Sequence, residues 1–330
     1  MSALHEMIRR QGDALRQVAE TDVSAAVQRL HAAPRVVLVG TGTSHHAAEL
    51  GAELMRAGGL DARAVTSVEY ARRERAADDE AVILLTHTGE TAFALDVRRR
   101  RLVDNGPLVA ITGPGLDWPE AIATPVRERS ETYTVSYTGA LAVLGLLAHR
   151  LAGAPTGPEA LLAVADRVAR IAAEPGIDHV PMPARALAVC GAGPWAVTAR
   201  EAALKLREGA RLLCEGFDAE RLLHGAAVPY GPADGLLLLQ PDADPDGLVA
   251  ALGDAARAEG IAVSELHGEA ADREAGPFLA QIPLTVRLQC LAARFAELRG
   301  TDPDTAITGA WAAPDLWALG APDAAVAAGS

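Results

Sequence analysis

The chain of 330 residues has a single lysine among its 30 basic residues, and the others are arginine. Aromatic side chains make up only 4% of the residues, and the three cysteines are widely spaced. An odd number of cysteines without metal-binding spacing predicts reduced thiols and no metal site. With few aromatics, the cores must be built from alanine, leucine and valine, which suits helices packed closely on parallel strands.

The charge balance and the hydropathy pattern exclude several classes of partner. A net charge of −13 argues against nucleic acid and against anionic membrane surfaces, because both require a basic surface. No uncharged apolar run approaches the ~20 residues of a membrane span, and the N-terminus lacks the apolar core of a signal peptide. We therefore expect a cytoplasmic protein without a cofactor. A negatively charged substrate would have to be held by local backbone donors.

Short apolar runs alternate with helix-like stretches along the chain, after one or two leading helices within residues 2–32. The strands expected in the first half are 35–40, 62–67, 80–86, 107–112 and 131–137. The strands expected in the second half are 185–191, 236–240, 262–266 and 282–285. Alternation of strands and helices, twice over, predicts two doubly wound parallel sheets of the α/β class.

The domain boundaries follow from the point at which this pattern restarts. The segment Gly153-Ala-Pro-Thr-Gly-Pro158 has the composition of a hinge. We predict N-terminal helices over 1–32, a first sheet domain over 33–155, a second over 156–305 and a tail over 306–330. The first domain would bind phosphate, and the second would supply the catalytic helix and loop.

Two hydroxyl-rich loops follow expected strands of the first domain. Gly40-Thr-Gly-Thr-Ser44 leaves the first strand, and Thr86-His-Thr-Gly-Glu-Thr91 leaves the third. Glycine lets the backbone approach an anion, and hydroxyls at a helix N-terminus add donors where the helix dipole favours negative charge. Each loop alone also fits an ordinary helix cap. Neither matches a nucleotide-binding motif, so together they predict a site for a simple phosphate.

The single lysine, Lys205, lies between two glutamates at helical spacing. Glu201, Lys205 and Glu208 stand at positions i, i+4 and i+7, so a helix would gather them on one face. His224 follows sixteen residues after Glu208. This pattern fits a carboxylate placed for proton transfer with a second acid/base nearby. The alternative is a helix that carries surface salt bridges.

An ordered set of motifs resembles the sugar isomerase (SIS) domain proteins, most closely the tandem type found in the isomerase half of glucosamine-6-phosphate synthase and in relatives without its glutaminase domain. The resemblance extends from about residue 5 to Asp304. It rests on Gly42–Ser44, Thr86–Thr91, Thr134–Ser136, Ala203–Glu208 and Arg221–Gly225.

The resemblance implies roles for particular residues. The phosphate of a hexose or hexosamine 6-phosphate would be held by Thr43, Ser44, Thr86, His87, Thr88, Thr91 and Ser136. Glu208 would be the base that moves a proton between C1 and C2, with Lys205 assisting beside it. His224 would open the sugar ring, donated across the interface of a homodimer. The resemblance also implies two flavodoxin-like SIS subdomains.

Several positions depart from the family pattern. His87 replaces a glutamine, Arg221 a glutamate and Thr138 a lysine. The family's tail carries a lysine near its end, whereas Thr305–Ser330 contains none and has Trp311 and Trp317 instead. We expect these tryptophans to be packing anchors, with a substrate lid as the alternative.

These observations predict a sugar-phosphate enzyme that works by proton abstraction. An aldose–ketose isomerase or an amino-sugar-phosphate isomerase or deaminase is the first expectation. The missing tail lysine weakens the deaminase interpretation and leaves a lyase or dehydratase, or a deglycase, open on the same substrate class. A protein that only binds a sugar phosphate as a sensor is the alternative from another class, although such a sensor would not need the Glu208 and His224 pair.

Overall fold

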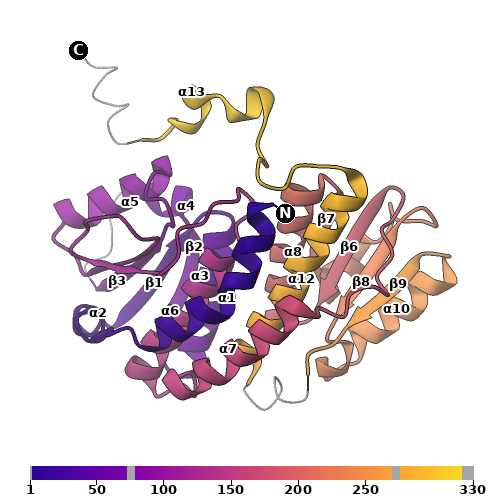
Figure 1. Ribbon diagram of the computed structural model, residues 1–330. Helices are drawn as coiled ribbons and strands as arrows, with labels where there is room; N and C mark the ends of the chain where they lie inside the picture. Colours follow the sequence, from indigo (N-terminus) through magenta and orange to yellow (C-terminus); the bar gives the residue numbers. More distant parts are fainter. Residues whose placement is uncertain (1, 73–78, 270–275, 322–330) are drawn as a thin grey trace. The chain divides into compact units, whose positions relative to one another are not determined.

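The computed structural model describes residues 2–72, 79–269 and 276–321 (Figure 1). The chain divides into two compact units, each built around one parallel sheet. The first-sheet unit comprises residues 13–128, 135–163 and 307–321, and the second-sheet unit comprises residues 2–12, 129–134 and 164–306. The chain passes between the units more than once, so the domain boundaries expected from the sequence stay a prediction about independent folding. Residues 322–330 of the expected tail lie outside the described residues.

The first sheet has the strand order β2-β1-β3-β4-β5, and the pairs are parallel. This order is that of flavodoxin-like folds. The strands are β1 (Arg35–Gly40), β2 (Asp61–Thr66), β3 (Glu80–Leu85), β4 (Leu108–Thr112) and β5 (Ala121–Ala123). The helices are α2 (Ser24–Leu30), α3 (Thr43–Ala57), α4 (Ser67–Ala71), α5 (Ala92–Val103) and α6 (Val135–Ala152), with α1 (Ala3–Ala19) at the start of the chain.

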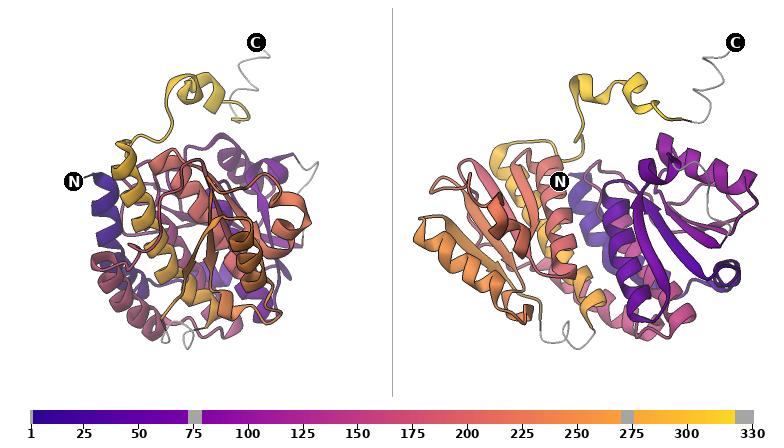
Figure 2. Two further views of the ribbon diagram at one scale, coloured as in Figure 1. Left: turned by 90° about the vertical axis from the view of Figure 1, so that its right-hand side faces the viewer. Right: turned by 180° about the vertical axis from the view of Figure 1, so that it is seen from behind.

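Helices cover both faces of the first sheet, as Figures 1 and 2 show. Alternating residues of β1 point to opposite faces of the sheet, because successive side chains of a strand alternate in direction. Val37 and Val39 pack in the cluster that includes residues of α4 and α5. Leu38 points the other way, where its side chain lies against Gly51 of α3. Both faces of the central strands are therefore buried, which explains their nearly continuous apolar sequence.

The second sheet has the order β7-β6-β8-β9, again with parallel pairs. Its strands are β6 (Ala186–Gly191), β7 (Leu213–Asp218), β8 (Gly235–Leu239) and β9 (Ala262–Leu266). The helices are α7 (Pro158–Ala173), α8 (Pro194–Ala210), α9 (Ala219–Arg221), α10 (Leu248–Ala258) and α12 (Pro277–Arg299), with a π-helical segment, η1 (Leu222–Ala226), after α9.

Two apolar clusters sandwich the second sheet. Val189 and Leu237 pack with residues of α8 and α12, whereas Cys190 and Leu238 pack on the opposite face with residues of α10. The cysteines are free, and burial raises the pKa of the Cys190 thiol to about 12. Cys190 and Cys214 are both buried, so the prediction that they are core thiols is confirmed.

Most expected elements are present, but two expected strands are wrong. Residues 131–137 form no strand, because α6 already begins at Val135, and the fifth strand is instead Ala121–Ala123. Residues 282–285 lie inside α12, a helix of 23 residues with Pro283 in its interior. A short apolar run with a proline fits a buried strand or a buried helix equally well by periodicity. Here α12 is buried on most sides, and packing outweighs the proline's missing donor.

The helix α6 is the only described helix with the length and hydropathy of a membrane span. However, 72% of it is buried inside the protein. Leu141, Leu144 and Leu147 contribute to this burial. The apolar sequence of α6 is thus that of a central helix packed on a sheet.

The tryptophans of the C-terminal tail are exposed, contrary to the expectation from the sequence. After α12 the chain forms a 3-10 turn, η3 (Gly309–Ala312), and a short helix, α13 (Pro314–Trp317). Trp311 is 76% exposed and Trp317 is 52% exposed. The indole nitrogen of Trp317 donates to the Trp311 carbonyl at 2.7 Å. Within the described chain these tryptophans pair locally, so the expectation of packing anchors is wrong.

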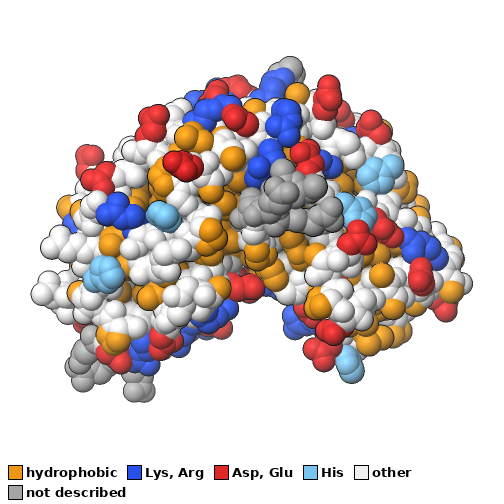
Figure 3. Space-filling view, turned by 90° about the horizontal axis from the view of Figure 1, so that it is seen from below, with side chains coloured by type: hydrophobic (Ala, Val, Ile, Leu, Met, Phe, Trp, Pro, Cys, Tyr) orange, Lys and Arg blue, Asp and Glu red, His pale blue; other side chains and the backbone are white. Residues whose placement is uncertain are grey.

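Acidic and basic side chains are interspersed on the face shown in Figure 3. This mixing accompanies the excess of carboxylates in the whole sequence, 43 against 30 basic residues. An anionic ligand on this face therefore meets both signs of charge.

Candidate functional site

The two hydroxyl-rich loops lie side by side at the carboxyl edge of the first sheet. β1 pairs with β3, with Val39 beside Leu84, so the loops that follow these strands start at the same level. The connection after β1 leads to β2 on one side, and the connection after β3 leads to β4 on the other, which makes the edge between β1 and β3 the topological switch point. Open α/β sheets bind ligands in the crevice at this point. The structure thus brings together the two loops that the sequence predicted.

The first loop owes its shape to two glycines. A side chain at Gly40 would place its Cβ 2.5 Å from the backbone of Ser44, so the loop folds directly onto the strand end. Gly42 has φ 55° and ψ −127°, a conformation that only glycine adopts without strain. Gly42 precedes α3 without a side-chain cap, so Thr43 and Ser44 begin the helix. The positive end of the helix dipole faces this loop.

The second loop places its hydroxyls around a turn at Gly89. Thr86 is buried at the end of β3, while Thr88 and Thr91 are half-buried. The Oγ of Thr88 accepts from the Glu90 N–H at 3.2 Å, and Thr91 precedes α5 without using its side chain as a cap. Gly89 has a φ of 69°, and a Cβ there would lie 2.6 Å from the Leu116 side chain. The turn is therefore held against the chain that follows β4.

His87, in the loop after β3, also contacts the segment that precedes α6. Its Nε2 accepts a hydrogen bond from the Glu128 N–H at 2.9 Å. Burial, aided by the charge of Arg127, lowers the pKa of His87 to about 4, so its ring is neutral at physiological pH. A Cβ at Gly113 would lie 2.5 Å from the ring, so the glycine leaves room for it. His87 thus connects the segment before α6 to the loop after β3 as a neutral acceptor.

Ser136 lies in the first turn of α6 and is buried. Its N–H and its hydroxyl both donate to Oε2 of Glu128, at 3.2 Å and 3.0 Å. A carboxylate of the protein itself therefore occupies the N-terminus of α6. The sequence did not reveal Glu128, because an acidic residue eight positions before a helical serine is no recognised capping pattern.

The starts of α3 and α6 are neighbours. A Cβ at Gly51 would lie 2.8 Å from Leu144, and one at Gly58 would lie 2.5 Å from Ala152. The contacts run in the same order along both helices, so the helices are parallel and their N-termini share one end. Packed helices are typically 8–10 Å apart. Ser44 and Ser136 consequently belong to one region of the first-sheet unit.

The predicted catalytic triplet lies on α8 in the second-sheet unit. The Nζ of Lys205 lies 2.5 Å from Oε2 of Glu208 and 3.7 Å from Oε1 of Glu201. The side chains of Lys205 and Glu201 are each 1% exposed, while that of Glu208 is 21% exposed. The side chains of a surface salt bridge would be exposed, so the alternative of a helix that carries surface salt bridges is wrong. One ammonium is shared between a buried carboxylate and a partly accessible one.

His224 lies in the π-helical segment after β7 and is exposed. The local backbone departs from helical geometry, with ψ 47° at His224 and φ 103° at Gly225. Gly225 makes this kink inexpensive, since its φ lies in the region that favours glycine. The kink presents the imidazole to the outside of its own unit.

Glu208 and His224 lie at opposite ends of the α8–β7 pair. A Cβ at Gly216 would lie 2.4 Å from the backbone of Ala199, which aligns the two elements. α8 runs against β7, because it connects the parallel strands β6 and β7. Glu208 is nine residues beyond Ala199, about 14 Å along the helix. His224 lies in the other direction, past the carboxyl end of β7. These two side chains do not meet within one unit.

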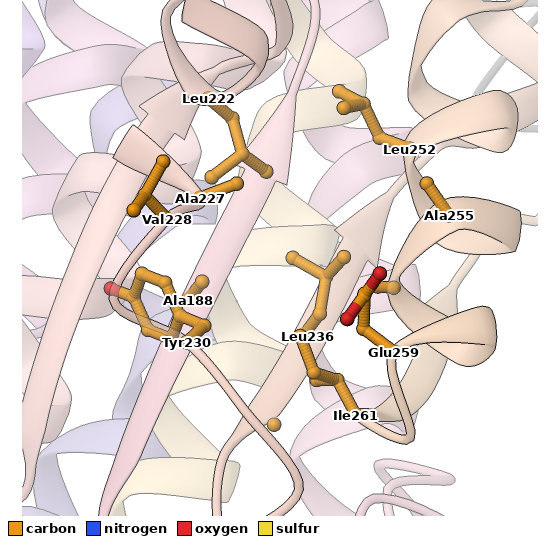
Figure 4. A pocket seen from close by; sticks show the side chains of 12 residues that line it. Ala188, Leu222, Ala227, Val228, Tyr230, Leu236, Leu252, Ala255, Glu259 and Ile261 are labelled. Atoms are coloured by element: carbon orange, nitrogen blue, oxygen red, sulfur yellow. The ribbon is translucent and has the colours of Figure 1, made fainter. Parts of the chain in front are cut away.

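An apolar cavity of about 270 Å³ lies in the second-sheet unit beside the segment that carries His224 (Figure 4). Leu222, Leu236, Leu252 and Tyr230 contribute to its wall, and Glu259 lies at its edge. None of the predicted site residues lines it. A sugar phosphate requires several hydrogen-bond donors, whereas the Tyr230 hydroxyl in this wall already donates to Glu215 at 3.1 Å and most of the lining is apolar, so the cavity does not fit the predicted ligand.

The described residues contain no group of three or more His, Cys, Asp or Glu side chains arranged to hold a metal ion. The candidate site itself offers hydroxyls, backbone N–H groups, carboxylates, one ammonium and imidazole.

Comparisons with known proteins bear on the fold of the chain. No family model matches the chain. The glutamine--fructose-6-phosphate aminotransferase [isomerizing] of Thermococcus kodakarensis is 27% identical over 305 residues, which cover 82% of this chain and 50% of that protein. The chain thus spans about half the length of this curated relative.

Solved structures share the fold over almost the whole chain. The tagatose-6-phosphate ketose/aldose isomerase of Escherichia coli is similar, with a TM-score of 0.78, 20% identity and coverage of 94% of this chain and 97% of that one. The glucosamine-6-phosphate deaminase of Thermotoga maritima has a TM-score of 0.76 at 19% identity and covers 92% of this chain and 97% of its own. The resemblance to the tandem SIS proteins is confirmed. The chain has the SIS fold, with two parallel sheets and helices on both faces of each.

Proposed function

We propose that the protein is an enzyme that moves a proton between neighbouring carbons of a hexose or hexosamine 6-phosphate. The main support is the contact of Glu208 with the buried ammonium of Lys205 at 2.5 Å. A proton next to a carbonyl group is removed by a positioned carboxylate, and the enediolate that forms needs a nearby cation or donor. Further support comes from the relatives, whose names describe an isomerizing aminotransferase, a deaminase and an isomerase of 6-phosphorylated sugars.

The phosphate would be held by neutral donors of the first-sheet unit. Thr43, Ser44, Thr86, Thr88 and Thr91 provide hydroxyls at a topological switch point, and the start of α3 provides backbone N–H groups. Anions bind at such helix starts because the N–H groups and the helix dipole act together. No lysine or arginine is required for this part of the site.

The triplet on α8 would then handle the proton. Glu201, Lys205 and Glu208 carry one net negative charge when all are ionised. When Glu208 takes up a proton from C2 or C1, Lys205 stays paired with Glu201 and the buried charges balance. Proton uptake thus leaves no unpaired ion in the interior, which would be costly. Glu208 is the member with the most exposed side chain, as a base that meets a substrate must be.

His224 would act on the ring of a substrate bound by another subunit. The support is its exposure and its separation from Glu208 within the second-sheet unit. In a symmetric dimer each subunit would donate His224 to the other, which gives two equivalent sites. The imidazole would open the ring before the proton is removed.

Exchange of the C2 proton in heavy water tests the proton transfer. Glucosamine, N-acetylglucosamine, glucose and fructose 6-phosphates are incubated with the protein, and NMR follows the C1 and C2 protons. We expect exchange on at least one sugar, its loss in Glu208→Gln, and its retention in Arg207→Gln, because Arg207 is the exposed neighbour on the same helix. Binding without exchange on any of the four sugars would favour a sensor.

Mixing two inactive variants tests the dimer. Glu208→Gln and His224→Asn subunits are combined after partial denaturation and refolding. Half of the dimers from an equal mixture are mixed ones, each with one intact site, so we expect about a quarter of the normal exchange rate. Activity no higher than that of the separate variants would show that both residues serve the same subunit.

A further inference from the structure

We propose that the apolar cavity of the second-sheet unit binds a small organic cation with an apolar body, such as an aryl-substituted alkylammonium. The cavity has a volume of about 270 Å³, and none of the predicted site residues lines it (Figure 4). The proposal does not depend on the proposed function, because it concerns a different ligand and its test needs no sugar.

The cavity exists because one face of the second sheet is covered incompletely. Residues of α8 and α12 pack on one face, whereas α10 is the main helix on the other. A helix is about 10 Å across and adjacent strands are about 4.8 Å apart, so a single helix covers about two of the four strands. The segment 222–230 covers part of the remaining face, and the cavity lies between this segment and α10.

Small and apolar residues form the floor of the cavity. Ala188 of β6 and Leu236 of β8 line it, whereas Leu187 and Val189 point to the opposite face of the sheet. The methyl group of Ala188 leaves space that a larger side chain would fill. An apolar cavity of about 150 Å³ stays dry and binds benzene, so this larger cavity has room for an aromatic ring with a short side chain.

Glu259 is the charged residue among the described residues that line the cavity. It follows the last turn of α10, where Gly260, with a φ of 77°, reverses the chain so that Ile261 joins the wall. Arg257, on the same turn of the helix, pairs instead with other carboxylates, those of Asp254 and Glu265. Within the described parts of the chain, no cation neutralises the Glu259 carboxylate.

Charge complementarity therefore selects the kind of ligand. The wall removes an apolar ring from water, and the Glu259 carboxylate attracts an ammonium group at the end of that ring's side chain and repels a carboxylate. The C-terminal end of α10 adds partial negative charge at the same place. The hydroxyl of Tyr230 is already engaged with Glu215, so the ring of Tyr230 is what it offers to the cavity.

A ligand in this cavity would also restrain the segment that carries His224. Leu222 and Ala227 line the wall on either side of His224 and Gly225. The backbone between them departs from helical geometry, with a φ of 103° at Gly225. Contacts on both sides of this kink oppose its local opening, so the amides of residues 222–228 should exchange with solvent more slowly when the cavity is occupied.

Calorimetry with three small molecules tests the site. 2-Phenylethylammonium, 2-phenylethanol and phenylacetate share a phenyl ring and differ in the charge at the end of its side chain. We expect the ammonium to bind about threefold more tightly than the alcohol, as is typical of an exposed ion pair, and the carboxylate to bind most weakly. Equal affinities of the ammonium and the alcohol would overturn the selection by charge. Absence of binding, as when a second copy of the chain fills the cavity, would overturn the site itself.

A leucine placed in the cavity tests the location. Ala255 lines the cavity from the exposed side of α10, and leucine is a good helix former, so Ala255→Leu should fold and weaken binding of the ammonium at least about tenfold. Ala251→Leu is the matched control, because Ala251 is exposed on the same helix and outside the cavity wall. Unchanged binding in Ala255→Leu would place the ligand elsewhere and overturn the proposal.

Removal of one carboxylate tests the role of charge. Glu259→Gln should abolish the preference for the ammonium over the alcohol while both still bind. Asp254→Asn should keep the preference, because the Asp254 carboxylate is engaged with Arg257. Hydrogen exchange of the native protein should slow in residues 222–228 when 2-phenylethylammonium is added, and should not change in Ala255→Leu. A preference that survives in Glu259→Gln, or exchange that the ammonium leaves unchanged in the native protein, would contradict the proposal.

Discussion

Replacing Lys205 by methionine would remove one cation from between two carboxylates. Methionine has a similar length and no charge, so the change isolates the electrostatic role of the ammonium. Glu201 would remain as a carboxylate that is 1% exposed, with no cation at the 3.7 Å now occupied by Lys205. Loss of the cation of a buried ion pair is among the few causes of large destabilisation by a single substitution.

The size of the effect follows from the burial and the distances. Two unit charges about 4 Å apart attract by roughly 4 kcal/mol at an effective dielectric constant of 20. Desolvation of the ions offsets part of this gain, so breaking a buried pair typically costs about 3–5 kcal/mol. That is a large share of the roughly 5–15 kcal/mol by which proteins are stable. We therefore expect Lys205→Met to lower the midpoint of thermal unfolding by roughly 5 °C.

Calorimetric unfolding of Lys205→Met, compared with Arg207→Met, measures the effect. Arg207 lies on the same helix, but its side chain is 50% exposed and its nearest carboxylate is 4.0 Å away. Its loss should change stability by less than about 0.5 kcal/mol. Adding Glu201→Gln to Lys205→Met should restore part of the lost stability, since it removes the negative charge that Lys205 neutralised in the interior. Equal, small effects of both methionine variants would refute the reasoning.

The other predictions concern the first-sheet unit. Ser44→Ala combined with Thr88→Val should weaken binding of a 6-phosphate sugar by roughly 1.5–3 kcal/mol for each donor lost to a charged group, and unchanged affinity in calorimetry would exclude this phosphate site. Burial lowers the pKa of His87 to about 4, from 6.5 in the unfolded chain. The neutral ring therefore makes its full contribution to the free energy of unfolding above pH 6.5. This contribution is lost as the pH falls from 6.5 through 4. Urea unfolding should show this loss, roughly 3 kcal/mol, in the native protein and a flatter pH profile in His87→Asn.

The main features of the fold could be predicted from the sequence. Apolar runs such as those of β1 and β6 are buried on both faces and end at glycine, so their parallel arrangement shows in the residues themselves. The two short runs at 131–137 and 282–285 could not be assigned in this way. Their length fits a strand or part of a buried helix, and only packing against neighbours decides between them.

The candidate site was predicted in part. The hydroxyl loops come together because parallel strands place their carboxyl ends at one edge, and the spacing of Glu201, Lys205 and Glu208 is a local property of a helix. The carboxylate of Glu128 on Ser136 could not be predicted, since a contact between a loop and a later helix depends on how the whole unit closes.

The sequence by itself determined which chemical groups are present and which strands and helices carry them. Secondary structure follows from the spacing of apolar residues and from turn-forming residues, and both are visible within a few neighbouring positions. The tertiary structure decided which charges are buried, which donors are already taken, and that Glu208 and His224 lie at opposite ends of the same strand and helix. These outcomes depend on contacts between distant segments, and the energy of each charge or hydrogen bond is set by the neighbours that exclude water from it.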